Sequence, residues 1–132
     1  MAAVPIGTRW EEKRLVTTEN AISFLGPEGP RVLSTPQMIG AMEWTCRNAV
    51  LPLLEPGHDT VGTHVNVAHR AAAPIGSVVI FTAEVTAVQD RRVEFKVTAR
   101  TDEELVGEGT HERAIINVAK FASRMAAKSG RK

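Results

Sequence analysis

The feature that most limits how this chain can fold is a run of four strand-length segments that follows one long apolar helix. Within each segment apolar and polar side chains alternate, and this period of two is typical of strands with one buried face. Short turns between consecutive strands favour antiparallel pairing, including a turn at 74–76 between the first two. The predicted strands cover residues 61–71, 77–88, 91–100 and 105–116.

The helix before these strands has clear start and stop signals. Ser34 or Thr35 can cap its N-terminus, and Pro36 suits its first turn. Apolar residues then recur at three- and four-residue steps from Met38 onward, which indicates a broad buried face. Pro52 should disturb the last turn, and the Pro-Gly pair that follows should end the helix.

The remaining segments complete an α+β domain in which a curved antiparallel sheet wraps a single helix. A short strand is predicted at 10–16, then a turn-rich loop with one helical turn at 20–24, and at the end of the chain a helix at 118–128. A helix this apolar needs more cover than one sheet supplies, which favours subunit pairing. We expect one domain over 1–132, with the first strand and a lid-like loop in 1–34, the central helix in 35–55, the antiparallel strands in 61–117, and a C-terminal helix with a basic tail in 118–132.

Charge and composition argue against several classes of protein. Sixteen Lys and Arg residues against 15 Asp and Glu residues leave a net charge of +1, so no nucleic-acid or membrane partner is expected. The N-terminus lacks the basic and then apolar pattern of a signal peptide, and no stretch approaches the roughly 20 apolar residues of a membrane span. The single cysteine, Cys46, lies in the apolar stripe of the helix, which predicts a core residue in a reducing compartment rather than a nucleophile. We therefore expect a cytoplasmic protein.

The four histidines do not predict a metal site. His64 and His69 are five residues apart on one predicted strand and should face opposite sides, while His58 lies in a turn and His111 on the last strand. His69 has the parity of the valines in its strand and should face the helix. His64 should face away and be dispensable for chemistry.

Four polar residues in apolar settings are candidates for chemistry. Glu43 borders the apolar face of the helix, where it either pairs with Arg47 on a solvated flank or is partly desolvated and becomes a base or nucleophile. Thr35 could serve only the helix start, and His69 could be a core histidine or, in its neutral form, accept a proton. Arg113 lies on the last strand. Because Thr35 and Glu43 are eight residues apart, about 12 Å of helix rise separates them, so a site that uses both lies along the helix, with substrate or a partner subunit between them.

Three stretches of the chain carry a resemblance to a known family. They are GAMEWTCRNAVLPLLEPG in the helix, VGTHVNVAHRAAAPIG in the next strand and GEGTHERAIINVAKF around the last strand. Together they resemble the fluoroacetyl-CoA thioesterase family of the hot-dog-fold superfamily, in one register from Thr35 to about Phe121. The resemblance implies a hot-dog fold, a homodimer, and acyl-CoA sites at the subunit interface. Coenzyme A would be part of the substrate, with no further cofactor.

The resemblance also implies roles for five residues. It assigns Thr35, Glu43 and His69 to catalysis, Gly62 to the substrate carbonyl, and Arg113 to substrate binding. Glu43 would attack the thioester carbonyl directly or direct a water, Thr35 would orient Glu43 by hydrogen bonding, and His69 would relay the proton. Gly62 suits a close approach of the backbone because it has no side chain.

The loop before the helix departs from the family pattern. In the fluoroacetyl-CoA-specific enzyme this segment is longer and supplies phenylalanines that cover the acyl pocket, whereas NAISFLGPEGPRVLST offers only Phe24. The expected activity is therefore hydrolysis of a short-chain acyl-CoA, with fluoroacetyl-type and other α-substituted acyl groups among the candidates. Two alternatives on the same fold are a non-catalytic acyl-CoA binding module and an enoyl-CoA hydratase.

Overall fold

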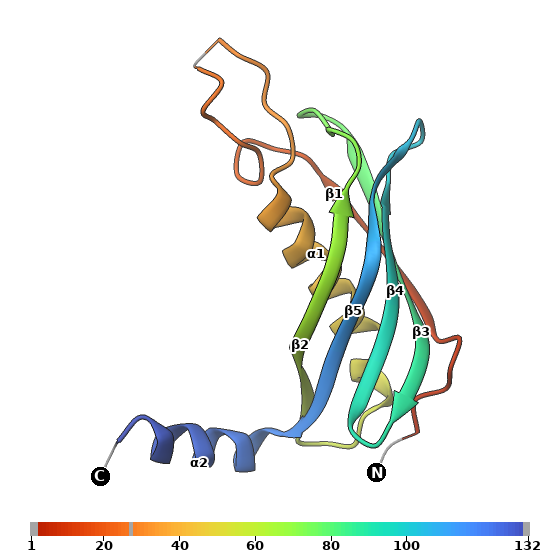
Figure 1. The fold of residues 1–132 in the computed structure, drawn as a ribbon, viewed down its shortest axis with the longest axis vertical. Helices are drawn as coiled ribbons and strands as arrows, with labels where there is room; N and C mark the ends of the chain where they lie inside the picture. The colour runs from red at the N-terminus through yellow and green to blue at the C-terminus, as the bar shows by residue number, and fades with distance from the viewer. Residues whose placement is uncertain (1–2, 27, 131–132) are drawn as a thin grey trace.

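A long helix crosses one face of a curved antiparallel sheet in the computed structural model, which describes residues 3–26 and 28–130 (Figure 1). The sheet has five strands in the order β1-β3-β4-β5-β2. The elements in chain order are β1 (Arg9–Leu15), α1 (Thr35–Val50), a 3₁₀ turn η1 (Leu51–Leu53), β2 (His58–His69), β3 (Val78–Gln89), β4 (Arg92–Arg100), β5 (Leu105–Asn117) and α2 (Val118–Lys128).

The core lies between α1 and the face of the sheet that curves around it. Met38, Met42 and Cys46 recur at one-turn spacing on α1 and are almost fully buried against Phe81 and Phe95 of the sheet. The predicted wrap of one helix by an antiparallel sheet is therefore confirmed. Pro52 lies within η1, where the α-helix tightens as expected, because a proline cannot continue the α-helical hydrogen bonding.

The expected hairpin between the first two long strands is wrong. β2 pairs with β5 at one edge of the sheet, and β3 pairs with β1 and β4. The connection from β2 to β3 bonds instead to the segment before α1: Leu33 N–H donates to Ala73 O at 2.8 Å, and Ile75 N–H donates to Arg31 O at 3.0 Å. This pairing supplies hydrogen-bond partners for backbone groups of the connection between β2 and β3. It leaves β2 as an edge strand.

The loop between β1 and α1 extends beyond the end of the sheet (Figure 1). The helical turn expected at 20–24 is absent; Ala21 instead forms an isolated antiparallel bridge with Leu33. Asn20 organises the entry to this loop, because its side-chain oxygen accepts from Thr17 N–H at 2.8 Å. Local hydrogen bonding by asparagine favours turns over helix, which explains the difference.

A β-bulge in β2 changes which side chains face α1. Gly62 lies opposite Arg113 and His64 lies opposite Glu112, so Thr63 is an extra residue without a partner position on β5. An extra residue of this kind bends the strand and shifts its alternation by one position.

The prediction that the odd-numbered residues of β2 face the helix is therefore right only after the bulge. Val65 and His69 lie opposite His111 and Gly107 and share the helix-facing side with them. Before the bulge the alternation is reversed: Thr60 faces the helix and is buried, whereas Val61 was expected there. Gly62 and His69, which have opposite parity in the sequence, consequently face the same side.

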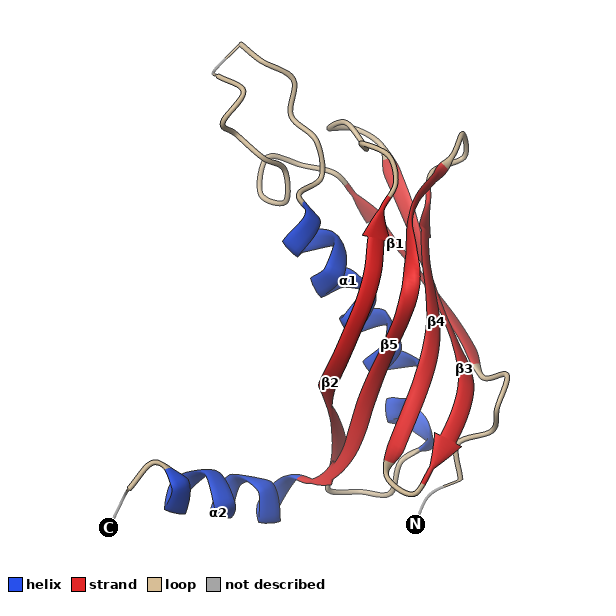
Figure 2. Cartoon of the chain, in the orientation of Figure 1, coloured by secondary structure: helices blue, strands red, loops and turns tan. Residues whose placement is uncertain are grey.

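The C-terminal helix α2 extends away from the sheet, beyond the edge formed by β2 (Figure 2). None of its side chains is buried in this chain. Among the described residues, no helix combines the length and the apolar character that crossing a membrane requires.

Candidate functional site

Thr35 and His69 form a hydrogen-bonded pair at the start of α1. Ser34 caps the helix, since its side chain accepts from Gln37 N–H, so the hydroxyl of Thr35 is not needed for capping. Thr35 Oγ1 lies 2.7 Å from His69 Nδ1. The other ring nitrogen, His69 Nε2, is buried and has no hydrogen-bond partner in the part of the chain that the structure describes. A buried orphan nitrogen on an otherwise ordered histidine is typical of a group that meets a substrate or a partner chain.

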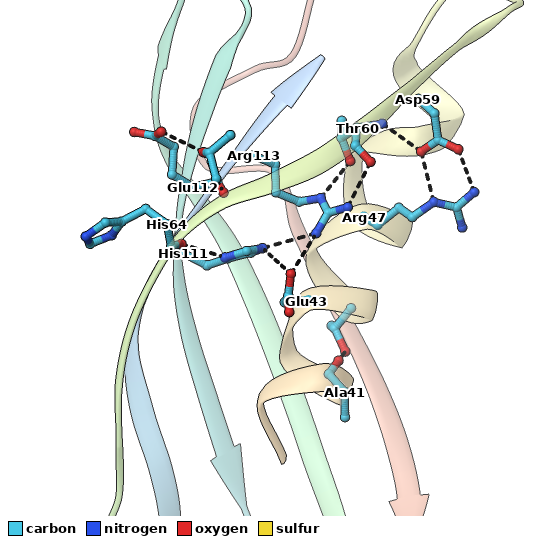
Figure 3. Close-up of polar contacts among 11 residues, drawn as sticks. Ala41, Glu43, Arg47, Asp59, Thr60, His64, His111, Glu112 and Arg113 are labelled. Atoms are coloured by element: carbon cyan, nitrogen blue, oxygen red, sulfur yellow. Dashed lines mark hydrogen bonds and ion pairs between the residues drawn. The ribbon is translucent and has the colours of Figure 1, made fainter. Parts of the chain in front are cut away.

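Glu43 lies two turns further along α1 and points toward the sheet (Figure 3). Its Oε1 is 3.6 Å from Arg113 Nη1, and its side chain is 38% exposed. Arg47 does not pair with Glu43; it donates to both carboxylate oxygens of Asp59, at 2.9 and 2.7 Å. The alternative in which Glu43 is an ordinary surface partner of Arg47 is therefore wrong. The carboxylate faces a buried guanidinium and remains accessible.

Arg113 is held rigidly from three directions. Its Nε donates to Thr60 Oγ1 at 2.7 Å and its Nη2 donates to Thr60 O at 2.9 Å, while Nη1 donates to His111 Nε2 at 3.1 Å. The residue is only 6% exposed, so its charge is directed at Glu43 rather than at solvent. Burial lowers the pKa of Arg113, and the negative charge of Glu43 opposes that effect.

His111 is a neutral member of this cluster. Its Nδ1 lies 2.8 Å from the backbone oxygen of His64, which can only accept, so Nδ1 carries the proton. Its Nε2 accepts from Arg113 and has no proton to donate to Glu43, although the two atoms are 3.8 Å apart. Burial is the largest cause of a lowered His111 pKa; the hydrogen bond to His64 opposes this shift, and the charge of Arg113 adds to it. Arg113 alone therefore supplies the positive charge next to Glu43.

Gly62 is the point where the backbone of β2 comes closest to this cluster. A Cβ atom at Gly62 would lie 2.5 Å from Glu43 Oε1, 3.2 Å from His111 Cε1 and 3.5 Å from Arg113 Nη1. A side chain at this position would require the Glu43 carboxylate to shift, so glycine leaves room for the carboxylate where it lies. The bulge follows directly, and bulges interrupt the regular hydrogen-bond ladder of the strand.

The five residues singled out in the sequence thus form two groups on the helix-facing side of β2 and β5. Thr35 contacts His69 near the start of α1, and Glu43 contacts Gly62 and Arg113 near its middle. Among the described residues, no hydrogen bond joins Thr35 to Glu43.

Sequence reasoning missed two members of the second group, Thr60 and His111. The alternation of β5 could have indicated His111, since it is two residues before Arg113 and shares its face. Thr60 could not be found in this way, because the bulge reverses the parity before it. The side chain of His64 is exposed, and only its backbone oxygen contributes to the cluster (Figure 3).

Known proteins resemble this chain over nearly its whole length. The sequence profile of the family described as fluoroacetyl-CoA-specific thioesterase matches residues 16–119. The fluoroacetyl-CoA thioesterase of Streptantibioticus cattleyicolor is 37% identical over 130 residues, which cover 94% of each chain.

Solved structures extend the comparison to the fold. A structure of the fluoroacetyl-CoA thioesterase FlK is 37% identical and superposes with a TM-score of 0.86 over 96% of this chain and 98% of that one. A Thermus thermophilus member of the thioesterase superfamily is 30% identical, with a TM-score of 0.88 over 98% of this chain and 96% of that one. A variant of FlK in complex with fluoroacetate and CoA is 39% identical, with a TM-score of 0.81 over 89% of this chain and 99% of that one.

A sheet wrapped around one helix, together with the similarity to solved thioesterases over nearly the whole chain, defines a thioesterase of the hot-dog fold. Within that class, the chain belongs to the fluoroacetyl-CoA-specific thioesterase family.

Proposed function

We propose that this chain hydrolyses a short-chain acyl-CoA to the free acid and CoA, with Glu43, Thr35 and His69 as the catalytic set. The observation that carries the proposal is the position of Glu43, an accessible carboxylate next to a glycine backbone and a buried guanidinium. Membership of a thioesterase family supports hydrolysis rather than binding alone or hydration of an enoyl group.

The chemistry assigned to Glu43 begins with its negative charge. The carboxylate attacks the thioester carbonyl or removes a proton from a water that attacks it. In the first route a carbon–oxygen bond to Glu43 forms and the carbon–sulfur bond breaks, and water then cleaves the mixed anhydride. In the second route the hydroxyl of water becomes part of the acid directly. Both routes release the CoA thiol and develop negative charge on the carbonyl oxygen.

The backbone at Gly62 and the charge of Arg113 would stabilise that oxygen. Hydrogen-bond donors fixed before the reaction stabilise a developing oxyanion most strongly where water is excluded. Arg113 is fixed by Thr60 and His111, and the bulge after Gly62 interrupts the hydrogen-bond ladder at this point. Thr35 would orient His69 to protonate the departing sulfur, since no described residue bonds to His69 Nε2. Because about 12 Å of helix rise separates Thr35 from Glu43, this step requires the dimer to bring the two groups to one thioester.

The loop before α1 would cover the acyl group. It ends at Thr35 and carries two exposed apolar side chains, Phe24 and Leu25, of which Phe24 is 79% exposed. Exposed apolar side chains on a loop next to a site are typical of a lid that closes over a ligand. A lid with one phenylalanine suits small acyl groups of several kinds, among them fluoroacetyl and other α-substituted groups.

A homodimer would complete this site. The five consecutive residues 62–66 of the edge strand β2 are exposed in the single chain, although they border the catalytic groups. An unprotected edge strand is a template for pairing with another chain. We also assign the protein to the cytoplasm, a reducing compartment that suits its single, unpaired cysteine.

Thiol release from acetyl-CoA and fluoroacetyl-CoA tests the proposal. Replacement of Glu43 by Gln should lower kcat by about 10²–10⁴-fold, the range expected when a general base or nucleophile is removed. His69→Ala should lower it by a similar order of magnitude. Cys46 will not disturb a thiol reagent in this assay, because it is fully buried and burial raises its pKa to about 12.

The matched control is His64→Ala, which removes an exposed histidine from the same strand. It should retain wild-type kcat, and circular dichroism should show that all three variants remain folded. Full activity in both Glu43→Gln and His69→Ala would refute the assignment of the site. If the loop covers the acyl pocket, Phe24→Ala should shift the substrate preference toward larger acyl groups, as measured with a panel of acyl-CoA substrates.

A further inference from the structure

One nitrogen of Arg113, Nη1, is shared between His111 and Glu43. Nη1 donates to His111 Nε2 at 3.1 Å, and Glu43 Oε1 lies 3.6 Å from the same nitrogen (Figure 3). The rest of the guanidinium is bound to Thr60, through Nε to its hydroxyl and through Nη2 to its backbone oxygen. Because Nη1 carries two N–H groups, the bond to His111 leaves the second N–H to face Glu43. The position of Nη1 relative to the carboxylate thus depends on His111.

The ring of His111 is itself held in place on two sides. It stacks on Phe95 of β4, with the ring centroids 6.2 Å apart and the planes at 27°, and the His111 side chain is only 1% exposed. Its Nδ1 donates to the backbone oxygen of His64 at 2.8 Å. The remaining polar atom of the ring, Nε2, is therefore directed at Arg113 in the unprotonated form, which accepts.

Protonation of His111 would reverse this arrangement. Nε2 would then carry a proton and could not accept from Arg113 Nη1, and two positive charges would face each other across 3.1 Å. The new N–H would instead be attracted to Glu43 Oε1, which lies 3.8 Å from Nε2. Repulsion would displace the guanidinium, and the new contact would occupy the carboxylate. Both effects oppose a reaction that uses Glu43 and Arg113.

The charged groups around His111 act on it from two elements. Glu43 faces the ring from α1, and Arg113 lies beside it on β5. Glu112 also acts on the ring, but as the next residue of the strand it projects from the opposite face of β5. β2 presents a backbone oxygen to the ring, and β4 presents an aromatic ring. Burial is the largest cause of the lowered His111 pKa, so the folded chain keeps the ring neutral to a pH below 6.5.

We propose that His111 is a positioning residue whose unprotonated Nε2 holds Arg113 at Glu43, so that turnover requires neutral His111. This inference rests on the proposed function, in which Glu43 reacts at the thioester and Arg113 faces the developing oxyanion. His111 acts through Arg113 and needs no contact with the substrate. Since kcat/KM depends on the protonation of essential groups in the free enzyme, it should fall as His111 becomes protonated below pH 6.5.

His111→Gln and His111→Leu test the inference through thiol release from acetyl-CoA at a series of pH values. The glutamine amide can accept from Arg113 but takes up no proton, so kcat/KM should stay within about tenfold of the wild type at neutral pH. The ratio of variant to wild-type kcat/KM should then rise below pH 6.5, by up to about tenfold per pH unit for one titrating group. Leucine offers no acceptor and should lower kcat/KM by about 10- to 100-fold at neutral pH.

Thr60→Val is the matched comparison, because it loosens the same guanidinium without removing a titrating group. It should lower kcat/KM, but its ratio to the wild type should stay constant with pH. His58→Gln removes a histidine at the start of β2, outside the cluster, and should keep the wild-type kcat/KM at every pH. A constant ratio in His111→Gln, or equal losses in His111→Gln and His111→Leu at neutral pH, would overturn the inference.

Nitrogen NMR tests the same contact without turnover. In the wild type, His111 should be protonated at Nδ1 alone at neutral pH, and the side-chain signals of Arg113 should shift as the ring titrates. In His111→Gln the Arg113 signals should not shift over the same pH range. Wild-type Arg113 signals that do not follow the titration of His111 would also contradict the inference. If the wild type hydrolyses no thioester, the proposed function fails, and this titration still decides whether His111 positions Arg113.

Discussion

The guanidinium of Arg113 links β5, β2 and α1 at the level of single residues. Its five N–H groups allow it to donate to Thr60 and His111 and still face Glu43. A lysine could not reproduce this fork of donors, so Arg113→Lys would leave part of the cluster without partners. The same arrangement keeps His111 neutral, and this has a consequence for stability.

The free energy of unfolding should fall as the pH is lowered below about 6.5, the pKa of histidine in an unfolded chain. The pKa of His111 is lowered in the folded chain, so the unfolded chain binds a proton that the folded chain does not. The contribution is therefore complete above pH 6.5 and is lost toward the lower, folded pKa, with a slope of at most about 1.4 kcal/mol per pH unit. Urea unfolding at a series of pH values measures it.

His111→Gln should flatten this pH dependence, while the exposed His64→Gln should retain it. Asp59 acts in a different window, because Arg47 lowers the pKa of Asp59 by hydrogen bonding and its contribution is lost only below about pH 4. An unchanged slope between pH 5 and 6.5 in His111→Gln would show that another group is responsible.

The first turn of α1 gives two adjacent hydroxyl residues different hydrogen-bond partners. Ser34 accepts a backbone N–H and caps the helix, whereas the hydroxyl of Thr35 bonds to His69. Both residue types are good helix caps, so sequence alone left the two roles open between them.

Alanine substitutions should separate these two roles. Ser34→Ala should lower the free energy of unfolding by about 1 kcal/mol, as expected for loss of an N-cap, with little change in kcat. Thr35→Ala should change stability less but lower kcat by roughly tenfold or more, because His69 loses its orienting partner. Chemical denaturation and thiol release, measured on both variants, check the pair. Equal effects of the two substitutions on kcat would contradict the division of roles.

The sequence predicted elements well where the signal is local. Strand alternation and helix signals predicted β3, β4, β5 and α2 to within about two residues, and the cap signals predicted the start of α1. The end of α1 was predicted too late, because the α-helix stops at Val50 and gives way to η1. The pairing of β2 with β5 was not predicted, because the partner of a strand depends on contacts between residues far apart in the chain. The bulge at Thr63 was also missed, although Gly62 directly before it was a possible signal, since an isolated glycine within a strand often marks a bulge.

The residues of the candidate site were likewise predictable where the signal is local and not where it depends on strand pairing. The polar character of Glu43 and His69 beside apolar positions made them candidates, and the family resemblance added Gly62. The position of Thr60 depends on the register of β2 against β5, which only the structure gives. The face of His111, by contrast, could have been inferred from the alternation of β5.

The molecule as a whole presents two surfaces that one chain leaves incomplete: the edge strand β2, and α2, which extends beyond that edge (Figure 1). Val65, at the middle of β2, faces the helix side yet is 39% exposed. A second copy paired along β2 would bury this valine.

Val65→Lys should therefore convert a dimer into monomers and lower kcat/KM. Insertion of a charge into a buried pairing surface is costly unless the charge finds a partner. The control Val88→Lys changes a valine of similar exposure, 36%, near the end of β3, and should leave the mass unchanged. Sedimentation velocity measures the mass of both variants. A wild-type protein that is monomeric at micromolar concentration would exclude this assembly.

The extra residue in β2 makes the number of residues in the strand as important as their identity. Removal of Thr63 would leave every catalytic side chain in the sequence, yet it would rotate either Gly62 or His69 to the outer surface. We expect a Thr63 deletion to abolish thiol release, whereas Thr63→Ala retains most of it. Thr63 thus keeps Gly62 and His69 on the same face of β2, although we propose no role for Thr63 in the reaction. A variant one residue shorter would still carry the family's motifs without the proposed site.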